Sequence, residues 1–219
     1  MPHKWLAFFA FGLLTVMVLA IFYVQSRPID LDASIKVAQE EAGTLAEPTV
    51  TVVNPMLGSA DAHITLVLFA DFTCQPCKEL AASILEVIKT YPQDVRLVWK
   101  DAPQYETSSV AAQSAVAAHC ADRQGKFWEY ADELFTNQTT LDAAEDLLHA
   151  AQSVSLDIER FNTCMETQDT LPIVERDYKE GRALGLVASP TLFLNDMPYT
   201  GALSFEQLLT YVEEELSNN

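Results

Sequence analysis

The chain has 219 residues, of which 49% are hydrophobic, and its 31 acidic and 13 basic residues give a formal charge of −18. This length suits one well-buried domain with an appendage rather than two large domains. The excess of acidic residues would repel a phosphate backbone, and no basic cluster offsets it along the chain. The composition therefore predicts no nucleic-acid partner.

An apolar run at residues 6–24 contains no charged residue. As a helix, at ~1.5 Å per residue, it would span roughly 28 Å, close to the thickness of a bilayer's hydrocarbon core. We interpret residues 1–27 as an uncleaved, single-pass transmembrane anchor. A cleaved signal peptide is the alternative, although its apolar region is usually shorter and ends in a small-residue cleavage site. Both interpretations predict that the rest of the chain lies outside the cytoplasm, on the periplasmic or extracellular face.

The orientation of this anchor depends on few charges. Lys4 precedes the apolar run and Arg27 follows it. This bias, with the acids that follow Arg27, favours a cytoplasmic N-terminus. A cytoplasmic location of the main domain remains an open alternative.

A polar, acid-rich segment at residues 28–48 has little large apolar surface to bury. Such composition is typical of a tether. We therefore expect the main domain to occupy residues 49–219.

The main domain begins with a strand, a cysteine motif and a helix. The apolar, β-branched run at 64–72 predicts a strand buried on both faces, and it leads into Cys74-Gln75-Pro76-Cys77. Apolar residues at helical spacing then predict a helix that ends near residue 91, followed by a second strand at 95–100.

The middle of the domain, about residues 104–184, is alanine-rich and amphipathic, which predicts a helical insertion. We expect its helices at residues 108–122, 127–136, 140–153, 157–166 and 171–184.

Strand character resumes at 191–195, with a possible hairpin partner at 199–202. The helix predicted at 205–216 has Ser204 in position to cap it. The pattern as a whole predicts an α/β domain whose sheet is interrupted in sequence by the helical insertion.

The C-x-x-C motif carries the chemistry expected of this domain. Two thiols at this spacing at a helix start can close a disulfide, and the helix N-terminus stabilises the thiolate of the first one, Cys74. A stabilised thiolate is both the attacking species and a good leaving group in disulfide exchange. We expect Cys74 to be the nucleophile and Cys77 to resolve the mixed disulfide. Pro76 suits the first turn, where its missing N–H costs nothing.

A zinc site is the competing interpretation of C-x-x-C. It would need a second ligand pair, but Cys120 and Cys164 are single and the four histidines form no pair at ligand spacing. The sequence therefore predicts no metal site.

Three segments together resemble the DsbA-like branch of the thioredoxin superfamily. They are DFTCQPCKEL, CADRQGKFWEYADELF and, much later, VASPTLFLND. The resemblance covers about residues 50–216. It implies a thioredoxin fold with an α-helical insertion, and a thiol–disulfide oxidoreductase whose redox-active disulfide serves without a further cofactor.

The resemblance also assigns residues outside the motif. Pro190 would be a cis-proline facing the disulfide, and Ser189 would present its backbone to an extended client peptide. Gln75 and Pro76 would support the active site. Some members of the family have a second disulfide in the insertion, which here implies a Cys120–Cys164 bridge. Buried free thiols and an electron-relay pair are the alternatives.

The chain departs from this family at two positions. Many thioredoxin-fold enzymes keep a buried acid six residues before the first cysteine, where this chain has Leu68, and Asp71 stands only three before it. Gln75-Pro76 leaves the redox direction undetermined.

Three residues outside the motifs are of types that could have a functional role. We expect His119 and His149 to be packed or solvated rather than catalytic. Lys100 would lie either near the thiolate or at a solvated strand end.

The predicted function is oxidation of dithiols in reduced, secreted client proteins, with reoxidation by a membrane quinone-coupled thiol oxidase that only the resemblance implies. A disulfide reductase or isomerase is one alternative. A non-catalytic thioredoxin-fold module that binds peptides, or copper through the same thiolates, is another.

Overall fold

The computed structural model describes residues 13–18, 23, 44–103 and 107–218. The contacts divide the chain into two units, Met1–Glu40 and Glu41–Asn219. Residues 13–18 of the first unit are helical, and no helix among the described residues has the length and hydropathy of a membrane span. Most of the predicted anchor and the predicted tether up to residue 43 lie outside the described residues.

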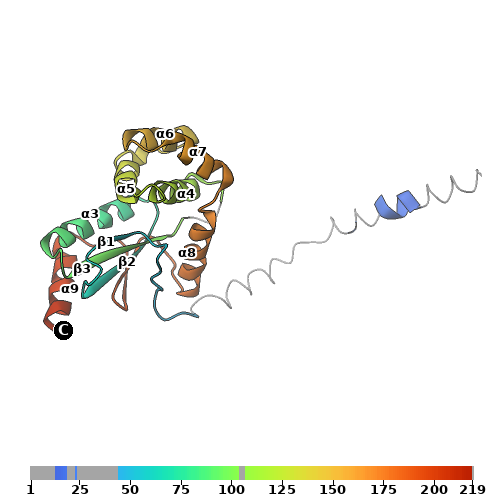
Figure 1. Cartoon of the computed structure of the whole chain (residues 1–219). Helices are drawn as coiled ribbons and strands as arrows, with labels where there is room; N and C mark the ends of the chain where they lie inside the picture. The colour runs from blue at the N-terminus through green and yellow to red at the C-terminus, as the bar shows by residue number, and fades with distance from the viewer. Residues whose placement is uncertain (1–12, 19–22, 24–43, 104–106, 219) are drawn as a thin grey trace, which may run out of the picture. The chain divides into compact units, whose positions relative to one another are not determined.

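The second unit contains a five-stranded sheet of order β1-β3-β2-β4-β5 (Figure 1). β2 and β3 are parallel, and the other neighbours are antiparallel. The strands are β1 (Met56–Gly58), β2 (Ile64–Ala70), β3 (Val95–Asp101), β4 (Thr191–Leu194) and β5 (Met197–Thr200).

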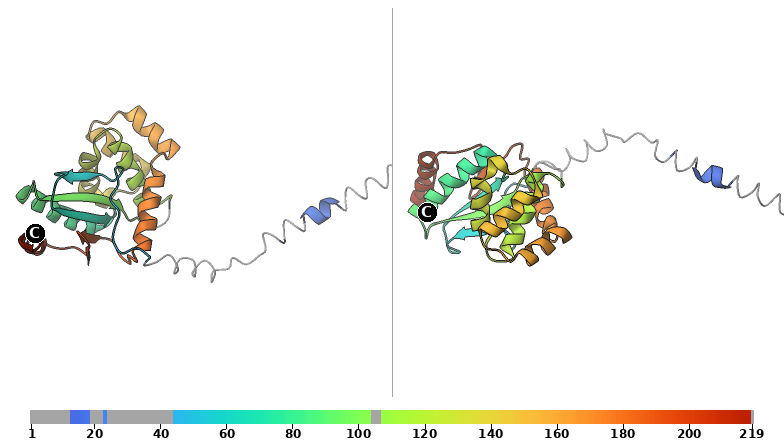
Figure 2. Two further views of the ribbon diagram at one scale, coloured as in Figure 1. Left: turned by 60° about the horizontal axis from the view of Figure 1, so that its bottom comes forward. Right: turned by 90° about the horizontal axis from the view of Figure 1, so that it is seen from above.

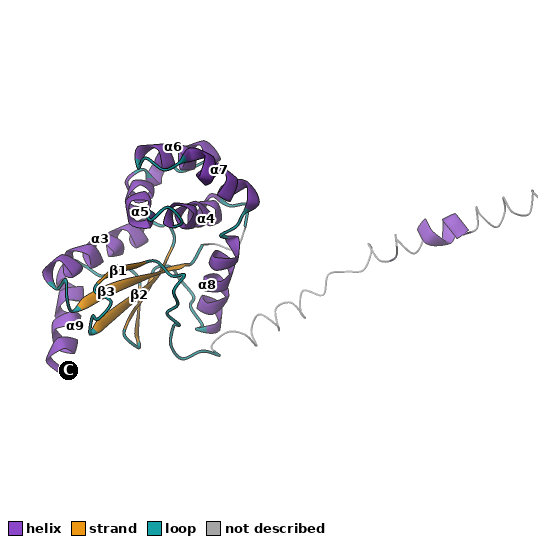
Figure 3. Cartoon of the chain, viewed as in Figure 1, coloured by secondary structure: helices purple, strands orange, loops and turns teal. Residues whose placement is uncertain are grey.

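One helix, α3 (Gln75–Thr90), connects β2 to β3, and α9 (Phe205–Asn218) ends the described chain. The predicted helical insertion separates β3 from β4 in sequence, and Figures 2 and 3 show most of its helices grouped beyond one end of the sheet. Its helices are α4 (Val110–Asp122), α5 (Phe127–Thr136), the short 3-10 helix η1 (Gln138–Thr140), α6 (Ala144–Ser153), α7 (Ile158–Thr167) and α8 (Leu171–Ala183).

The central strand β2 is buried on both faces, as its sequence predicted. Leu66 and Leu68 belong to the large apolar cluster that includes α3, α9 and the insertion. Val67 and Phe69 point to the other face, where they pack with residues that follow α8. Because the strand alternates between two cores, its sequence reads as a continuous apolar run. α3 and α8 are thereby held on opposite faces of the sheet.

The edge strand β1 was not predicted. It has only three residues, so no alternation pattern could reveal it, and its pairing with β3 supplies its hydrogen bonds. Gly58 ends it with φ +105°, and a Cβ there would lie 2.6 Å from the Val95 carbonyl oxygen. Close backbone approach therefore requires glycine at this position.

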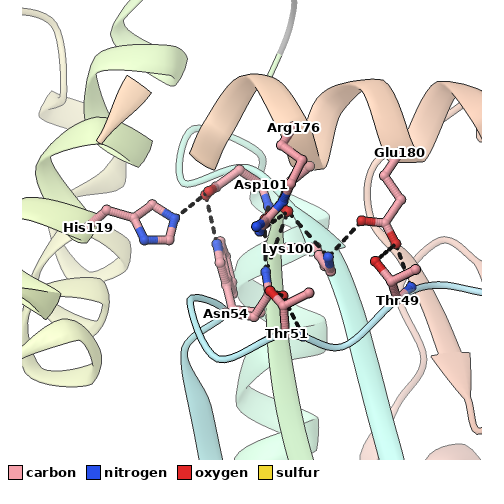
Figure 4. A network of polar contacts seen from close by, with 10 residues as sticks. Thr49, Thr51, Asn54, Lys100, Asp101, His119, Arg176 and Glu180 are labelled. Carbon is pink, nitrogen blue, oxygen red and sulfur yellow. Dashed lines mark hydrogen bonds and ion pairs between the residues drawn. The ribbon is translucent and has the colours of Figure 1, made fainter. Parts of the chain in front are cut away.

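A buried ion cluster lies between β3 and α8 (Figure 4). Lys100 is fully buried, and its Nζ lies 2.7 Å from Glu180 Oε2 and 3.2 Å from Asp177 Oδ1. Of the two alternatives expected for Lys100, the solvated strand end is therefore wrong. The two α8 carboxylates supply the partners that allow a lysine to be buried here.

The same cluster holds the segment that precedes β1. The Thr49 hydroxyl donates to Glu180 Oε1 at 2.8 Å, and Asn54 Nδ2 donates to Asp177 Oδ2 at 3.2 Å. The Leu45 N–H donates to the Ala183 carbonyl at 2.9 Å. Residues 45–54 are therefore fastened along α8 by polar contacts.

His119 joins the insertion to the end of β3. It is buried, as expected, and its Nε2 lies 2.6 Å from Asp101 Oδ2, while Trp99 Nε1 donates to the other carboxylate oxygen at 2.8 Å. Burial acts to lower the pKa of His119, but the charge and hydrogen bond of Asp101 outweigh it, so this pKa is raised. The pair connects α4 directly to the sheet.

Replacing Lys100 tests the importance of this cluster. Lys100→Met would remove the buried cation beside Glu180 and one of the two cations that Asp177 contacts, Arg176 being the other, so we expect the free energy of unfolding to fall by about 3–5 kcal/mol. Urea unfolding measures the change. The matched control is Lys179→Met on the exposed face of α8, where the pair with Glu175 spans 3.7 Å and contributes little. Equal effects of the two substitutions would contradict the assignment.

Candidate active site

The first cysteine of the motif caps helix α3. Cys74 has extended backbone dihedrals, and its Sγ accepts the N–H of Cys77 at 3.1 Å. Pro76 lies in the first turn of the helix, where its missing N–H removes no helical hydrogen bond. The sulfur therefore lies against the positive end of the helix.

Cys74 and Cys77 are joined by a disulfide of 2.04 Å. Cys77 is fully buried, whereas Cys74 is only partly buried. This difference in exposure fits the predicted roles, because a client can reach only the first sulfur.

The loop before β4 lies over this disulfide. The Ser189 carbonyl oxygen is 3.7 Å from Cys74 Sγ, and the Ser189 hydroxyl is 3.3 Å from Cys77 Sγ. A disulfide sulfur carries no hydrogen, so the hydroxyl is the donor. The Ser189–Pro190 peptide bond is cis. The structure thus brings these two residues to the cysteines as the resemblance implied.

The turn between β2 and α3 is held from two sides. Asp71 Oδ1 accepts the Thr73 N–H at 2.6 Å and the Thr73 hydroxyl at 2.8 Å. From the insertion, Gln138 Nε2 donates to the carbonyls of Phe72 and Cys74. Gln138 was not among the predicted site residues, because it lies 64 residues from Cys74 in sequence and follows no local motif.

Gln75, which was predicted to support the active site, is exposed, and its Nε2 contacts Glu79 at 3.3 Å.

A groove of about 840 Å³ opens beside Cys74. Its walls include residues 109–111 at the start of α4, residues 177, 178, 181 and 182 of α8, and residues 186–189. Mixed apolar and polar lining of this kind suits an extended polypeptide.

The groove also borders the buried ion cluster, because Asp177 belongs to the cluster and lines the groove. Burial, followed by the charge of Asp101, raises the pKa of Asp177, while Lys100 and Arg176 act in the opposite direction. Leu68 is fully buried. The buried carboxylates of this region come from the residue after β2, Asp71, and from β3 and α8.

The second cysteine pair lies within the insertion. Cys120 on α4 and Cys164 on α7 form a disulfide and are both buried. Each cysteine of the chain is thereby paired. Searching the described residues found no cluster of three or more His, Cys, Asp or Glu side chains that could hold a metal ion.

A family model described as thioredoxin matches residues 50–214. The chain belongs to the thioredoxin family. Among curated proteins, the Na+/H+ antiporter NhaA 1 of Mycolicibacterium gilvum is 33% identical over 158 residues, which make up 71% of this chain and 25% of the antiporter. The thioredoxin-family chain thus spans about a quarter of the length of the curated relatives it matches.

Two solved structures share the thioredoxin-like fold of this chain. Oxidised BdbD from Bacillus subtilis is 20% identical, covers 80% of this chain and 99% of its own, and has a TM-score of 0.67. The thiol–disulfide exchange protein alpha-DsbA2 from Wolbachia pipientis is 19% identical, covers 83% and 97%, and has a TM-score of 0.66. The predicted resemblance to DsbA-like oxidoreductases and the α/β thioredoxin-like fold are confirmed. Both findings are consistent with the predicted protein disulfide oxidoreductase activity.

Removing the second disulfide separates stability from catalysis. The bridge closes a loop with a sequence separation of 44. The variant Cys120→Ala/Cys164→Ala should lose about 2–4 kcal/mol of unfolding free energy, because its unfolded chain is less constrained. It should still oxidise a dithiol peptide. Normal stability with lost oxidation would instead indicate an electron relay through this pair.

Proposed function

We propose that this thioredoxin-family chain is an extracytoplasmic thiol–disulfide oxidoreductase that oxidises dithiols in reduced, secreted client proteins through Cys74 and Cys77. The observation that carries the proposal is the position of Cys74 Sγ, which accepts a helix N-terminal N–H and borders a groove large enough for a peptide. A sulfur in this position leaves readily as a thiolate. No cofactor other than the disulfide takes part in the exchange.

The reaction begins when a client thiolate attacks Cys74 Sγ. The Cys74–Cys77 bond breaks, a mixed disulfide forms, and Cys77 leaves as a thiolate that takes up a proton. The second client thiol, after losing its proton, attacks the client sulfur of the mixed disulfide and releases the Cys74 thiolate. Two electrons have then passed from the client to the enzyme, whose two cysteines are now reduced.

The Ser189–Pro190 loop would orient the client during these steps. The Ser189 carbonyl lies beside Cys74, where it can accept an N–H of an extended client chain. The Ser189 hydroxyl can donate to the Cys77 thiolate as that sulfur leaves.

The apolar run at residues 6–24 supports membrane anchoring in this proposal, with a membrane quinone-coupled thiol oxidase accepting the two electrons. The domain would then act on the periplasmic or extracellular face, where disulfides form and persist.

Substitution of the nucleophile tests the catalytic proposal. Cys74→Ser in the full-length protein should abolish oxidation of a dithiol peptide, because no mixed disulfide can form. Mass spectrometry of the peptide follows the loss of two hydrogens. Retained oxidation would overturn the proposal. For a non-catalytic peptide-binding module, wild type and variant should both bind a peptide while neither oxidises it.

The reduction potential, measured by equilibration with glutathione, decides the direction of exchange. A value near that of DsbA, about −120 mV, is expected for an oxidase. A value near that of thioredoxin, about −270 mV, would assign the chain to the reductases.

A further inference from the structure

Gln138 is a residue of the insertion that acts on the backbone of the nucleophile. It is the first residue of η1, two positions after the last residue of α5, and its side chain is buried, with only 8% of the residue exposed. Its Nε2 lies 2.7 Å from the Phe72 carbonyl oxygen and 2.9 Å from the Cys74 carbonyl oxygen. The primary amide has two N–H groups, so each carbonyl receives one.

The orientation of this amide follows from its surroundings. Within the described part of the chain, Gln138 Oε1 has no hydrogen-bond partner. Turning the amide over would place that oxygen against two carbonyl oxygens and lose both bonds. The amide therefore meets the turn as a donor only.

One of the two carbonyls belongs to Cys74, the N-cap of α3, and the other to Phe72, two residues before it. The Cys74 carbonyl also accepts from Cys77 N–H at 3.1 Å and Lys78 N–H at 3.3 Å, which start helix α3. Gln138 thus holds the peptide unit that precedes Thr73 and the one that follows Cys74. This orientation keeps Cys74 Sγ directed at the Cys77 N–H.

We propose that Gln138 is a positioning residue for disulfide exchange: its amide clamps the carbonyls of Phe72 and Cys74 and so holds the Cys74 sulfur at the amino end of α3. The inference rests on the proposed function, and it makes the helical insertion part of the redox machinery as well as a wall of the groove. Two physical effects act together. The clamp preserves the cap geometry, and the amide hydrogens add positive partial charge near the sulfur.

Gln138→Leu removes both N–H groups of the amide and replaces it with an apolar side chain of similar size. The comparison uses the full-length protein in a Cys120→Ala/Cys164→Ala background, so that only Cys74 and Cys77 carry thiols. We expect alkylation of reduced Cys74 by iodoacetamide, at an acidic pH where the thiolate is partial, to slow by about threefold or more. The reduction potential should become more negative, because the thiolate is less stabilised.

Two further substitutions give the experiment its specificity. Gln138→Glu keeps the shape but directs a carboxylate at two carbonyls, so it should slow alkylation at least as much as Gln138→Leu. Gln138→Asn keeps an amide that is one methylene too short, and an intermediate rate is expected. Gln138→Asn also supplies the comparison if Gln138→Leu does not fold.

Tyr130→Phe is the matched control for a purely structural loss. Tyr130 is fully buried in the same insertion, and its hydroxyl donates to the Leu147 carbonyl at 2.9 Å, a bond within the insertion. This variant should lower the melting temperature and leave the alkylation rate and potential unchanged.

The proposal is overturned if the Gln138 variants lose stability but keep the wild-type alkylation rate and reduction potential. That is the result expected of the Tyr130→Phe control. This outcome is independent of the proposed function, because alkylation needs no client. Failure of the wild-type protein to oxidise a dithiol peptide would remove the proposed function, while the comparison of Cys74 reactivity would still decide the role of Gln138.

Discussion

The hydrogen bond from the Cys77 N–H to the Cys74 sulfur, 3.1 Å long, places the reactive atom at the amino end of α3. Most features around the site maintain this arrangement. β2 delivers the chain to the turn, Asp71 and Gln138 hold the turn, and α3 packs its buried face on the sheet. Helix N-terminal N–H groups lack partners within their helix, and a sulfur anion is a suitable acceptor for them.

The sheet separates two structural tasks. Its α3 face carries the apolar cluster that positions the cysteines, while its α8 face buries Lys100 between Asp177 and Glu180. Buried ion pairs add little net stability over apolar packing, but they allow few alternative partners. α8 carries both carboxylates of this cluster and is followed by the Ser189–Pro190 loop, so the cluster fixes the element from which that loop departs.

Local patterns in the sequence were enough to predict most elements and the two cysteines of the candidate site, which form a disulfide. The C-x-x-C spacing, the apolar run of β2 and the periodicity of the insertion each depend on neighbours in sequence. β1, Gln138 and the partners of Lys100 were missed for the opposite reason. β1 exists only through pairing with β3, and the contacts of Gln138 and Lys100 join residues more than 60 positions apart. One sequence contains no local signal for such contacts.

The proposed chemistry depends on the ionisation of the Cys74 sulfur. Titration of Cys74 in the reduced full-length protein, followed by thiolate ultraviolet absorbance with Cys74→Ser as the blank, tests it most directly. We expect a pKa well below the value of free cysteine, about 8.5. A Cys74 that ionises like free cysteine would contradict the account, since the helix end would then give the sulfur no advantage as nucleophile or leaving group.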